Sequence, residues 1–215
     1  VGDRLPWQVK SAILNSLSLM LEKGGNNLKP FLPPLQSAFI KALQDANESV
    51  RSKAAAALGV LVGMNPRIDA LITEILTTLK KNAFLKLADK SSAQFDQQMA
   101  GVCIALLQAL HNILSDTVVK TLKPTVLTAV SQTILAMMEV RENTVVPQSV
   151  TILNGSHGQN SLTLEKIRAI AARCVVQCMK AMPAQDFESL YTDDIVSEND
   201  DEDSLESRLA ILNAM

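Results

Sequence analysis

The feature that most constrains this chain is the spacing of its apolar residues, which recur in steps of three and four. Residues at this spacing share one face of an α-helix. No stretch of comparable length alternates with period two, as a half-buried strand would. The sequence therefore predicts an all-α fold in which each helix buries one stripe. The four clearest stripes are Ile13, Leu17, Met20 and Leu21; Leu32, Leu35, Phe39 and Leu43; Val50, Ala54, Ala57, Leu58 and Leu61; and Ile68, Leu71, Ile72, Ile75 and Leu79.

The predicted helices repeat. Val9-Lys10 precedes one apolar helix, and Val50-Arg51 precedes another 41 positions later. A proline-bearing helix from about residue 28 lies between them, and Gly, Asn and Pro residues mark the helix ends. A period near 40 residues with two helices per unit is typical of HEAT and armadillo arrays. We therefore predict a HEAT/armadillo-like, right-handed α-solenoid of antiparallel helix pairs.

The repeat units drift in length along the chain. We predict one array over residues 1–196 and, from 197 to 215, an acidic linker followed by a possible terminal helix. The acidic run 198–203 is interpreted as a solvated loop, with a docking tail for a basic partner as the alternative. Within the array, units are expected at about 1–24, 28–63, 66–115 and 117–182, and a Gly-, Asn- and Ser-rich stretch at 141–162 is expected to be a mobile loop insert.

Composition narrows the class of protein. Apolar residues make up 47% of the chain but aromatic residues only 3%, which suits helix-on-helix packing. A net charge of −2 gives no overall attraction to nucleic acid or to an acidic membrane.

Three cysteines without framework spacing indicate a reducing compartment, so we expect a cytoplasmic protein. No apolar run is long enough to span a bilayer. Because Val1 falls within an apparent repeat, we expect a fragment of a longer protein.

A small motif precedes two of the helices. An Asp ahead of the helix can cap exposed amide groups, and the following Val can fill the groove between helices. The adjacent Lys or Arg can reach the Asp of a neighbouring unit and form the ladder typical of HEAT families. For Asp45 and Arg51 this structural role and contact with a partner remain alternatives.

No constellation suited to catalysis or metal binding is evident. His111 lies among apolar helix residues, and His157 lies in the polar stretch. Cys174 and Cys178 share a helix face, but that face is also the apolar stripe, so we interpret both as buried core residues. We therefore expect a non-enzyme with no catalytic residue, metal, cofactor or small-molecule substrate. Trp7 is interpreted as a plug between repeats, with an exposed partner anchor as the alternative.

Several motifs in unbroken order resemble one family. They are residues 2–10 (GDRLPWQVK), 28–36 (LKPFLPPLQ), 41–45 (KALQD), 50–59 (VRSKAAAALG) and 66–71 (PRIDAL). This sequence of motifs is similar to the C-terminal HEAT-repeat region of the large general-control translational activator, which supports activation of the amino-acid-starvation kinase of the initiation factor. The resemblance covers about residues 1–80.

The resemblance implies a docking surface for an RWD domain, chiefly the one at the kinase N-terminus, and association of the parent chain with ribosomes. The basic positions within the matching motifs are Arg51, Lys53 and Arg67, and we expect them to contact the partner. The alternatives are a generic HEAT-repeat adaptor for another protein, or a ribosome-contacting segment that uses Lys80, Lys81, Lys86 and Lys90. The structural alternative for these four lysines is that cations are favoured at the end of a helix by the helix dipole.

Overall fold

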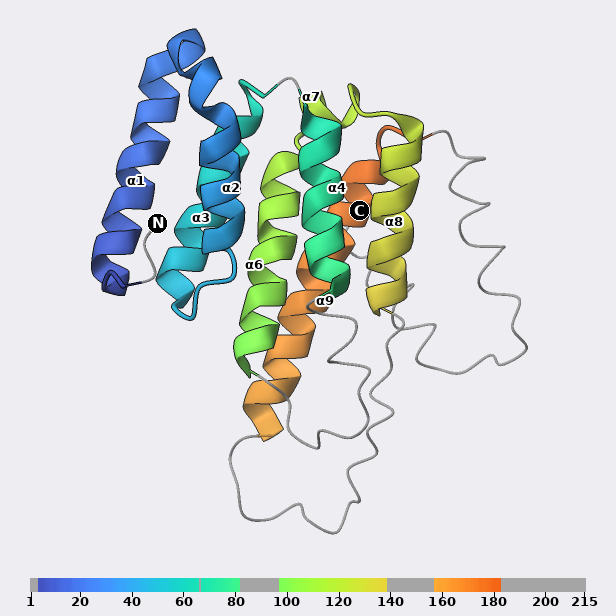
Figure 1. Cartoon of the computed structure of the whole chain (residues 1–215). Coiled ribbons are helices and arrows are strands. Elements are labelled where there is room, and N and C mark those ends of the chain that lie inside the picture. Colours follow the sequence, from blue (N-terminus) through green and yellow to red (C-terminus); the bar gives the residue numbers. More distant parts are fainter. Residues whose placement is uncertain (1–3, 66, 82–96, 139–156, 183–215) are drawn as a thin grey trace, which may run out of the picture.

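The structure is a computed structural model that describes residues 4–65, 67–81, 97–138 and 157–182 (Figure 1). Within these ranges it contains helices and no strand, so the predicted all-α, HEAT-like solenoid is confirmed. The elements are α1 (Trp7–Gly24), the 3₁₀ helix η1 (Gly25–Phe31), α2 (Leu32–Ala42), α3 (Glu48–Val62), α4 (Ile68–Leu79), α6 (Gln97–Ile113), α7 (Asp116–Val119), α8 (Pro124–Met138) and α9 (His157–Met179).

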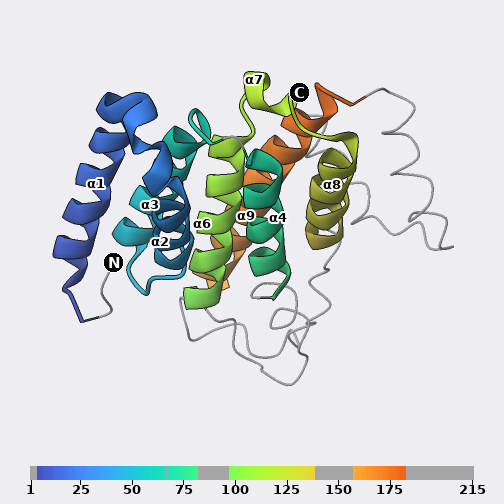
Figure 2. The same ribbon diagram turned by 45° about the horizontal axis from the view of Figure 1, so that its top comes forward.

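The helices form two layers. Helices α1, α3, α6 and α9 make one layer, in which each packs against the next, and α2, α4 and α8 pack against α3, α6 and α9 from the other layer. Helix α1 therefore lies at one end of the stack and α8 at the other, as Figures 1 and 2 show. Among the described helices, none is long and apolar enough to cross a membrane.

Local sequence explains where the first helices begin and end. Gly25 adopts a φ of 51°, a left-handed conformation that glycine tolerates, and α1 ends there. Pro33 lies in the first turn of α2, where its missing N–H costs no helical hydrogen bond. Asn47 caps α3, because its side chain accepts a hydrogen bond from the N–H of Ser49. The chain thus reverses direction at residues whose side chains or backbone favour either the end of one helix or the start of the next.

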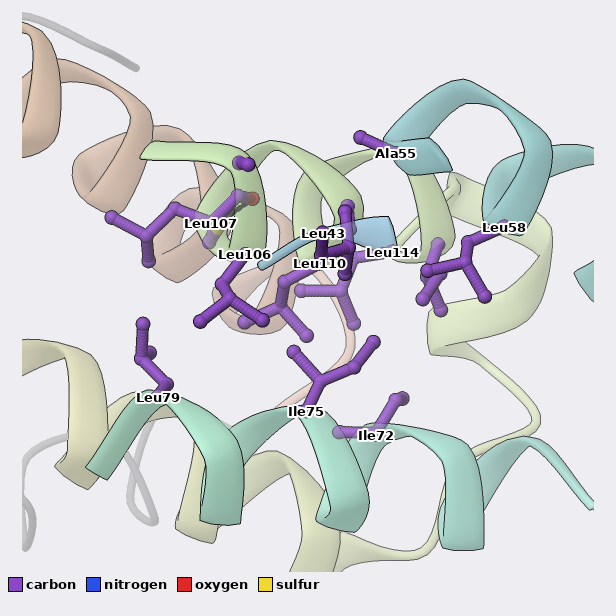
Figure 3. Packing of buried hydrophobic residues seen from close by; sticks show 14 of the residues in the cluster. Leu43, Ala55, Leu58, Ile72, Ile75, Leu79, Leu106, Leu107, Leu110 and Leu114 are labelled. Atoms are coloured by element: carbon purple, nitrogen blue, oxygen red, sulfur yellow. Dashed lines mark hydrogen bonds between the residues drawn. The ribbon is translucent and has the colours of Figure 1, made fainter. Parts of the chain in front are cut away.

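The core fills the space between the layers. Figure 3 shows side chains of α4 directed toward those of α6, with α3 and the end of α2 closing one side. Burying a leucine or isoleucine side chain away from water stabilises the folded state by roughly 1.5–3 kcal/mol. The apolar stripes predicted for α2, α3 and α4 supply this core together with residues of α6. The core includes the fully buried Leu43, Leu58, Ile72, Ile75, Leu79, Leu106 and Leu110.

Helices α3 and α6 approach each other closely at Gly59. A Cβ atom at this position would lie 3.1 Å from the Cβ of Asn112. One turn away, the Asn112 side-chain amide donates a hydrogen bond of 3.1 Å to the carbonyl of Ala55. The small residues of α3 therefore allow the two helices to pack closely, and the asparagine sets their alignment.

The structure corrects one predicted boundary. The polar insert was expected to extend through residue 162, yet α9 begins at His157. Residues 158–162 contain weak helix formers, but extending an existing helix adds one hydrogen bond for each residue ordered, so a well-packed helix can extend through them. The rest of the insert (141–156), the connection near 82–95 and residues 197–215 lie outside the described residues.

The close approach at Gly59 yields a test of the fold. Gly59→Leu is expected to destabilise the chain by about 1–3 kcal/mol, because the new side chain must push α3 and α6 apart. The same change at Gly63, where an added Cβ meets only a carbonyl at 3.6 Å, should not destabilise it. Urea denaturation of both variants measures the difference, and equal stabilities would contradict the proposed packing.

Candidate interaction surface

Of the basic residues singled out from the sequence, Arg51 and Lys53 lie at the start of α3, just after the loop that joins α2 to α3. This loop contacts the first turns of α1 and α3, so it links two repeat units. We call the polar cluster there the α1–α3 edge; its members are Lys10, Ser11, Asp45, Ala46, Asn47, Ser49 and Arg51.

An ion pair connects the two units at this edge. Lys10 Nζ lies 2.8 Å from Asp45 Oδ2, and the two side chains are only 15% and 14% exposed. Next to this pair, the hydroxyls of Ser11 and Ser49 are 3.3 Å apart. The predicted ladder, in which the basic residue of one unit reaches the Asp of its neighbour, is confirmed for Lys10 and Asp45.

Asp45 also shapes the loop, though not as the helix cap that the sequence indicated. Its Oδ1 accepts a hydrogen bond of 2.9 Å from the Asn47 N–H, and Asn47 in turn caps α3. Although burial opposes ionisation, the hydrogen bonds from Lys10 and from the Asn47 backbone hold the pKa of Asp45 below its usual value. Asp45 thus orders the turn that places the cap.

Arg51 is buried, with 7% of its surface exposed. Its Nη1 donates hydrogen bonds of 2.8 Å to the carbonyl oxygens of Asp45 and Ala46, and its guanidinium packs against Gly101 of α6. Burial lowers the pKa of Arg51, while Glu48 and Asp45 act in the opposite direction. These contacts give Arg51 the structural role that the sequence left open beside partner contact.

Lys53 and Arg67 are both exposed, but the structure does not bring them together. Lys53 lies in the second turn of α3, whereas Arg67 lies beyond the far end of that helix, at the start of α4 (Figure 1). The backbone N–H of Arg67 donates to the Asn65 side chain, which bonds Gln36 of α2. Lys53 therefore lies near the start of α3 and Arg67 lies beyond its end, at the start of the next repeat unit.

The cysteines belong to the core, as predicted. Cys103, Cys174 and Cys178 are all buried and free. Burial raises the pKa of Cys103 and of Cys178 to about 12, and it raises the pKa of Cys174 as well, so all three remain protonated and weakly nucleophilic at neutral pH. Burial, with Arg173 nearby, lowers the pKa of His111. In the described part of the chain, no group of three or more His, Cys, Asp or Glu residues could hold a metal ion.

Two further expectations concern exposed residues. Trp7 opens α1 with 45% of its surface exposed, and its interpretation as a plug between repeats stays a prediction, because it needs a unit ahead of α1. Lys80 and Lys81 are exposed at the end of α4, while Lys86 and Lys90 lie outside the described residues.

Sequence reasoning missed the contribution of Asn47 and Gly101 to the packing of the α1–α3 edge. An asparagine directly ahead of an apolar helix is a recognisable capping signal, so Asn47 could have been found. Gly101 carries no such signal, because its role depends on the approach of Arg51 from another unit.

Comparison with known proteins places the first part of the chain. A family model described as a HEAT-like repeat matches residues 7–60. The chain is 54% identical over 80 residues to the human protein named stalled ribosome sensor GCN1. It is 51% identical over 80 residues to Protein ILITYHIA of Arabidopsis thaliana, and 44% identical over 82 residues to the Saccharomyces cerevisiae eIF-2-alpha kinase activator GCN1.

These matches confirm the resemblance to the translational activator. They cover 37–38% of this chain but only 3% of each relative, so the chain spans a small part of the length of the relatives it matches. No solved structure matches the chain.

The lowered pKa of Asp45 predicts a pH-dependent contribution to stability. It should be present above the unfolded pKa of roughly 3.9 and lost as the pH falls through the folded value. Asp45→Asn should therefore cost about 1–3 kcal/mol at pH 7, and the difference from wild type should shrink at pH 3. Asp116→Asn is the control: it removes an ion pair whose side chains are 52% and 66% exposed, so it should cost less than about 1 kcal/mol. Urea denaturation at both pH values provides the measurement.

The contact between Arg51 and Gly101 predicts energetic coupling. A Cβ at Gly101 would collide with the guanidinium, so Gly101→Ala should lose much of the roughly 1 kcal/mol that alanine gains over glycine inside a helix, because Arg51 must shift from the two carbonyls. In the Arg51→Ala background the same change should stabilise the chain by about that amount, because the obstacle is gone. A double-mutant cycle measured by thermal or urea unfolding should show a coupling above about 0.5 kcal/mol, and additive effects would contradict the contact.

Proposed function

We propose that this chain is a segment of a non-catalytic HEAT-repeat scaffold that binds an RWD-type domain of a stress-response protein kinase and supports its activation in translational control. The observation that carries the proposal is the 44–54% identity to proteins named eIF-2-alpha kinase activator or stalled ribosome sensor. The family resemblance implies the RWD domain as the partner. Because such a scaffold acts where translation occurs, we place it in the cytoplasm.

Lys53 is the side chain best placed to make the contact. Its exposed neighbours on the same face of α3, Ser52 and Ala56, are small, so a partner could approach the helix closely. The ammonium group would then meet a carboxylate of the partner as a point charge. Arg67 would make a second, separate contact with its planar fork of donors.

Arg51 would act through the loop rather than by touching the partner. Its hydrogen bonds to the Asp45 and Ala46 carbonyls hold the turn from which α3 starts. Together with the Lys10–Asp45 ion pair, they keep the first turns of α3 in one position. A surface that is already ordered loses little conformational entropy on binding, which favours affinity.

A ribosome-contacting role is the second candidate, and the name of the human relative supports it. Contact with RNA phosphates would make binding fall steeply as salt rises. If the exposed Lys53 instead contacts a small protein domain, the affinity should depend much less steeply on salt concentration. Titration of the chain against ribosomes and against a purified RWD domain at about 50 and 200 mM salt would separate the two.

The RWD proposal is tested by calorimetric titration of the chain with the purified N-terminal RWD domain of the kinase. Lys53→Ala is expected to weaken binding by about 3–10-fold, because it removes one partly desolvated charge contact. Arg67→Ala should weaken it by a similar factor. Neither change should alter the melting temperature, since both side chains are exposed.

Lys166→Ala, an exposed lysine of α9, is the matched control and should bind like wild type. Arg51→Ala should lower both the stability and the affinity, as expected for a positioning residue. Absence of wild-type binding would overturn the proposal of an RWD partner. Wild-type affinity in Lys53→Ala and Arg67→Ala would overturn the assigned contacts.

A further inference from the structure

The described helices and the C-terminal segment of the chain carry opposite charges. The described residues contain sixteen Lys and Arg residues but only seven Asp and Glu residues, which gives them a net charge of +9. Residues 183–215 contain ten Asp and Glu residues and a single Arg, which gives this segment a net charge of −9. Half of these ten acidic residues fall in the acidic run 198–203. The overall charge of −2 therefore conceals a strongly basic stack that is joined to a strongly acidic segment.

Four of the basic residues lie together at the edge of the stack where α9 ends. Lys123 Nζ, just ahead of α8, lies 3.6 Å from Oδ2 of Asp69 in the first turn of α4. Lys180 Nζ, just beyond α9, lies 3.2 Å from Oδ1 of Asp116 in α7. These two contacts join the start of α4, the connection around α7 and the end of α9 into one surface (Figure 2). We call it the α7 edge; its exposed cations are Arg67, Lys120, Lys123 and Lys180.

The two aspartates do not neutralise the α7 edge. The side chains of Lys123 and Lys180 are 74% and 52% exposed, and ion pairs that are open to water contribute little to stability. Within the described ranges, neither Arg67 nor Lys120 has a carboxylate within ion-pair distance. The edge therefore keeps an excess of positive charge, and an anionic segment can bind there by replacing the weakly held aspartates.

We propose that the acidic run 198–203 binds the α7 edge of its own chain. The backbone leaves α9 at this edge, where the Met182 N–H donates a hydrogen bond to the Cys178 carbonyl. Sixteen residues separate Met182 from Glu198, and an extended chain of this length spans at most about 55 Å. Because neighbouring helix axes lie about 8–10 Å apart, the run can reach all four cations of the edge. A covalently linked segment also has an effective concentration on the order of millimolar, so weak contacts are sufficient.

Binding of the run would compete with a partner protein at Arg67. This step rests on the proposed function, in which the Arg67 guanidinium contacts a carboxylate of the RWD domain. The acidic run presents the same chemical group to the same planar fork of donors. Since only one carboxylate-bearing segment can occupy the edge at a time, the run should lower the affinity of the chain for its partner.

Zero-length carbodiimide cross-linking of the whole chain tests the docking, because the reagent joins carboxylates to amines that are in contact. At about 50 mM salt, mass spectrometry should find links from the run to Lys120, Lys123 or Lys180. These links should fade at about 500 mM salt, where screening shortens the range of the attraction to a few ångströms. The largely buried Lys10–Asp45 pair, whose charged atoms are 2.8 Å apart, is the positive control in the same sample.

A mixture of unlabelled and ¹⁵N-labelled chains shows whether each link lies within one chain or joins two. Links found only between different chains would overturn docking of the run on its own edge. Lys80 and Lys81 lie at the opposite end of α4, and links to them in equal yield would overturn the assigned site. The absence of any link from the run would overturn the proposal.

Calorimetric titration with the purified RWD domain tests the competition. A variant in which the five acidic residues of the run become amides should bind about 2–5-fold more tightly than wild type. In the Arg67→Ala background this gain should disappear. The control for total charge is a variant in which the four acidic residues at positions 186, 188, 193 and 194 become amides, and its affinity should stay within about 2-fold of wild type.

The two experiments can fail separately. Cross-links from the run to the α7 edge combined with an unchanged affinity of the amide variant would overturn the competition but not the docking. An equal gain in the control variant, or a gain that persists without Arg67, would also overturn the competition. Absence of RWD binding by wild type would overturn the proposed function, whereas the cross-links would still decide whether the run binds the edge.

Discussion

Helix α3 is packed on three sides, by α1 and α6 within its own layer and by α2 from the other layer. The rest of the described stack depends on how α3 packs, because a helix cannot bury its apolar stripe without a neighbouring helix. The sequence of α3 suits such crowding: Ala54, Ala55 and Ala57 are buried and Gly59 faces α6 without a side chain. Stability is therefore shared between neighbouring units, as expected for a repeat array.

Apolar packing holds the layers together, but polar contacts fix how the units align. Lys10 meets Asp45 between α1 and α3, Asn112 reaches the Ala55 carbonyl between α6 and α3, and the Gln36 amide donates to Glu74 between α2 and α4. The Asn112 and Gln36 contacts each contribute on the order of 1 kcal/mol in net stability, and the mostly buried Lys10–Asp45 ion pair contributes more. Each of the three is satisfied in only one register. Alignment of the units thus depends on a few side chains.

The same contacts distribute the basic residues between two roles. Lys10 and Arg51 are occupied in ordering the α1–α3 edge, whereas Lys53 and Arg67 are exposed. The two exposed cations lie on backbone that the neighbouring polar contacts hold in place.

The sequence by itself determined the helical class, the 41-residue repeat, the buried cysteines and the family resemblance of the first units. These follow from apolar periodicity and local motifs, which are properties of neighbouring residues. The predicted end of the polar insert was wrong by several residues, because packing extends α9 beyond the local helix propensity of its first residues. Only the tertiary structure decided which basic residue is buried. Arg51 and Lys53 are two positions apart, and Arg51 is enclosed because Gly101, fifty residues later, leaves room for its guanidinium.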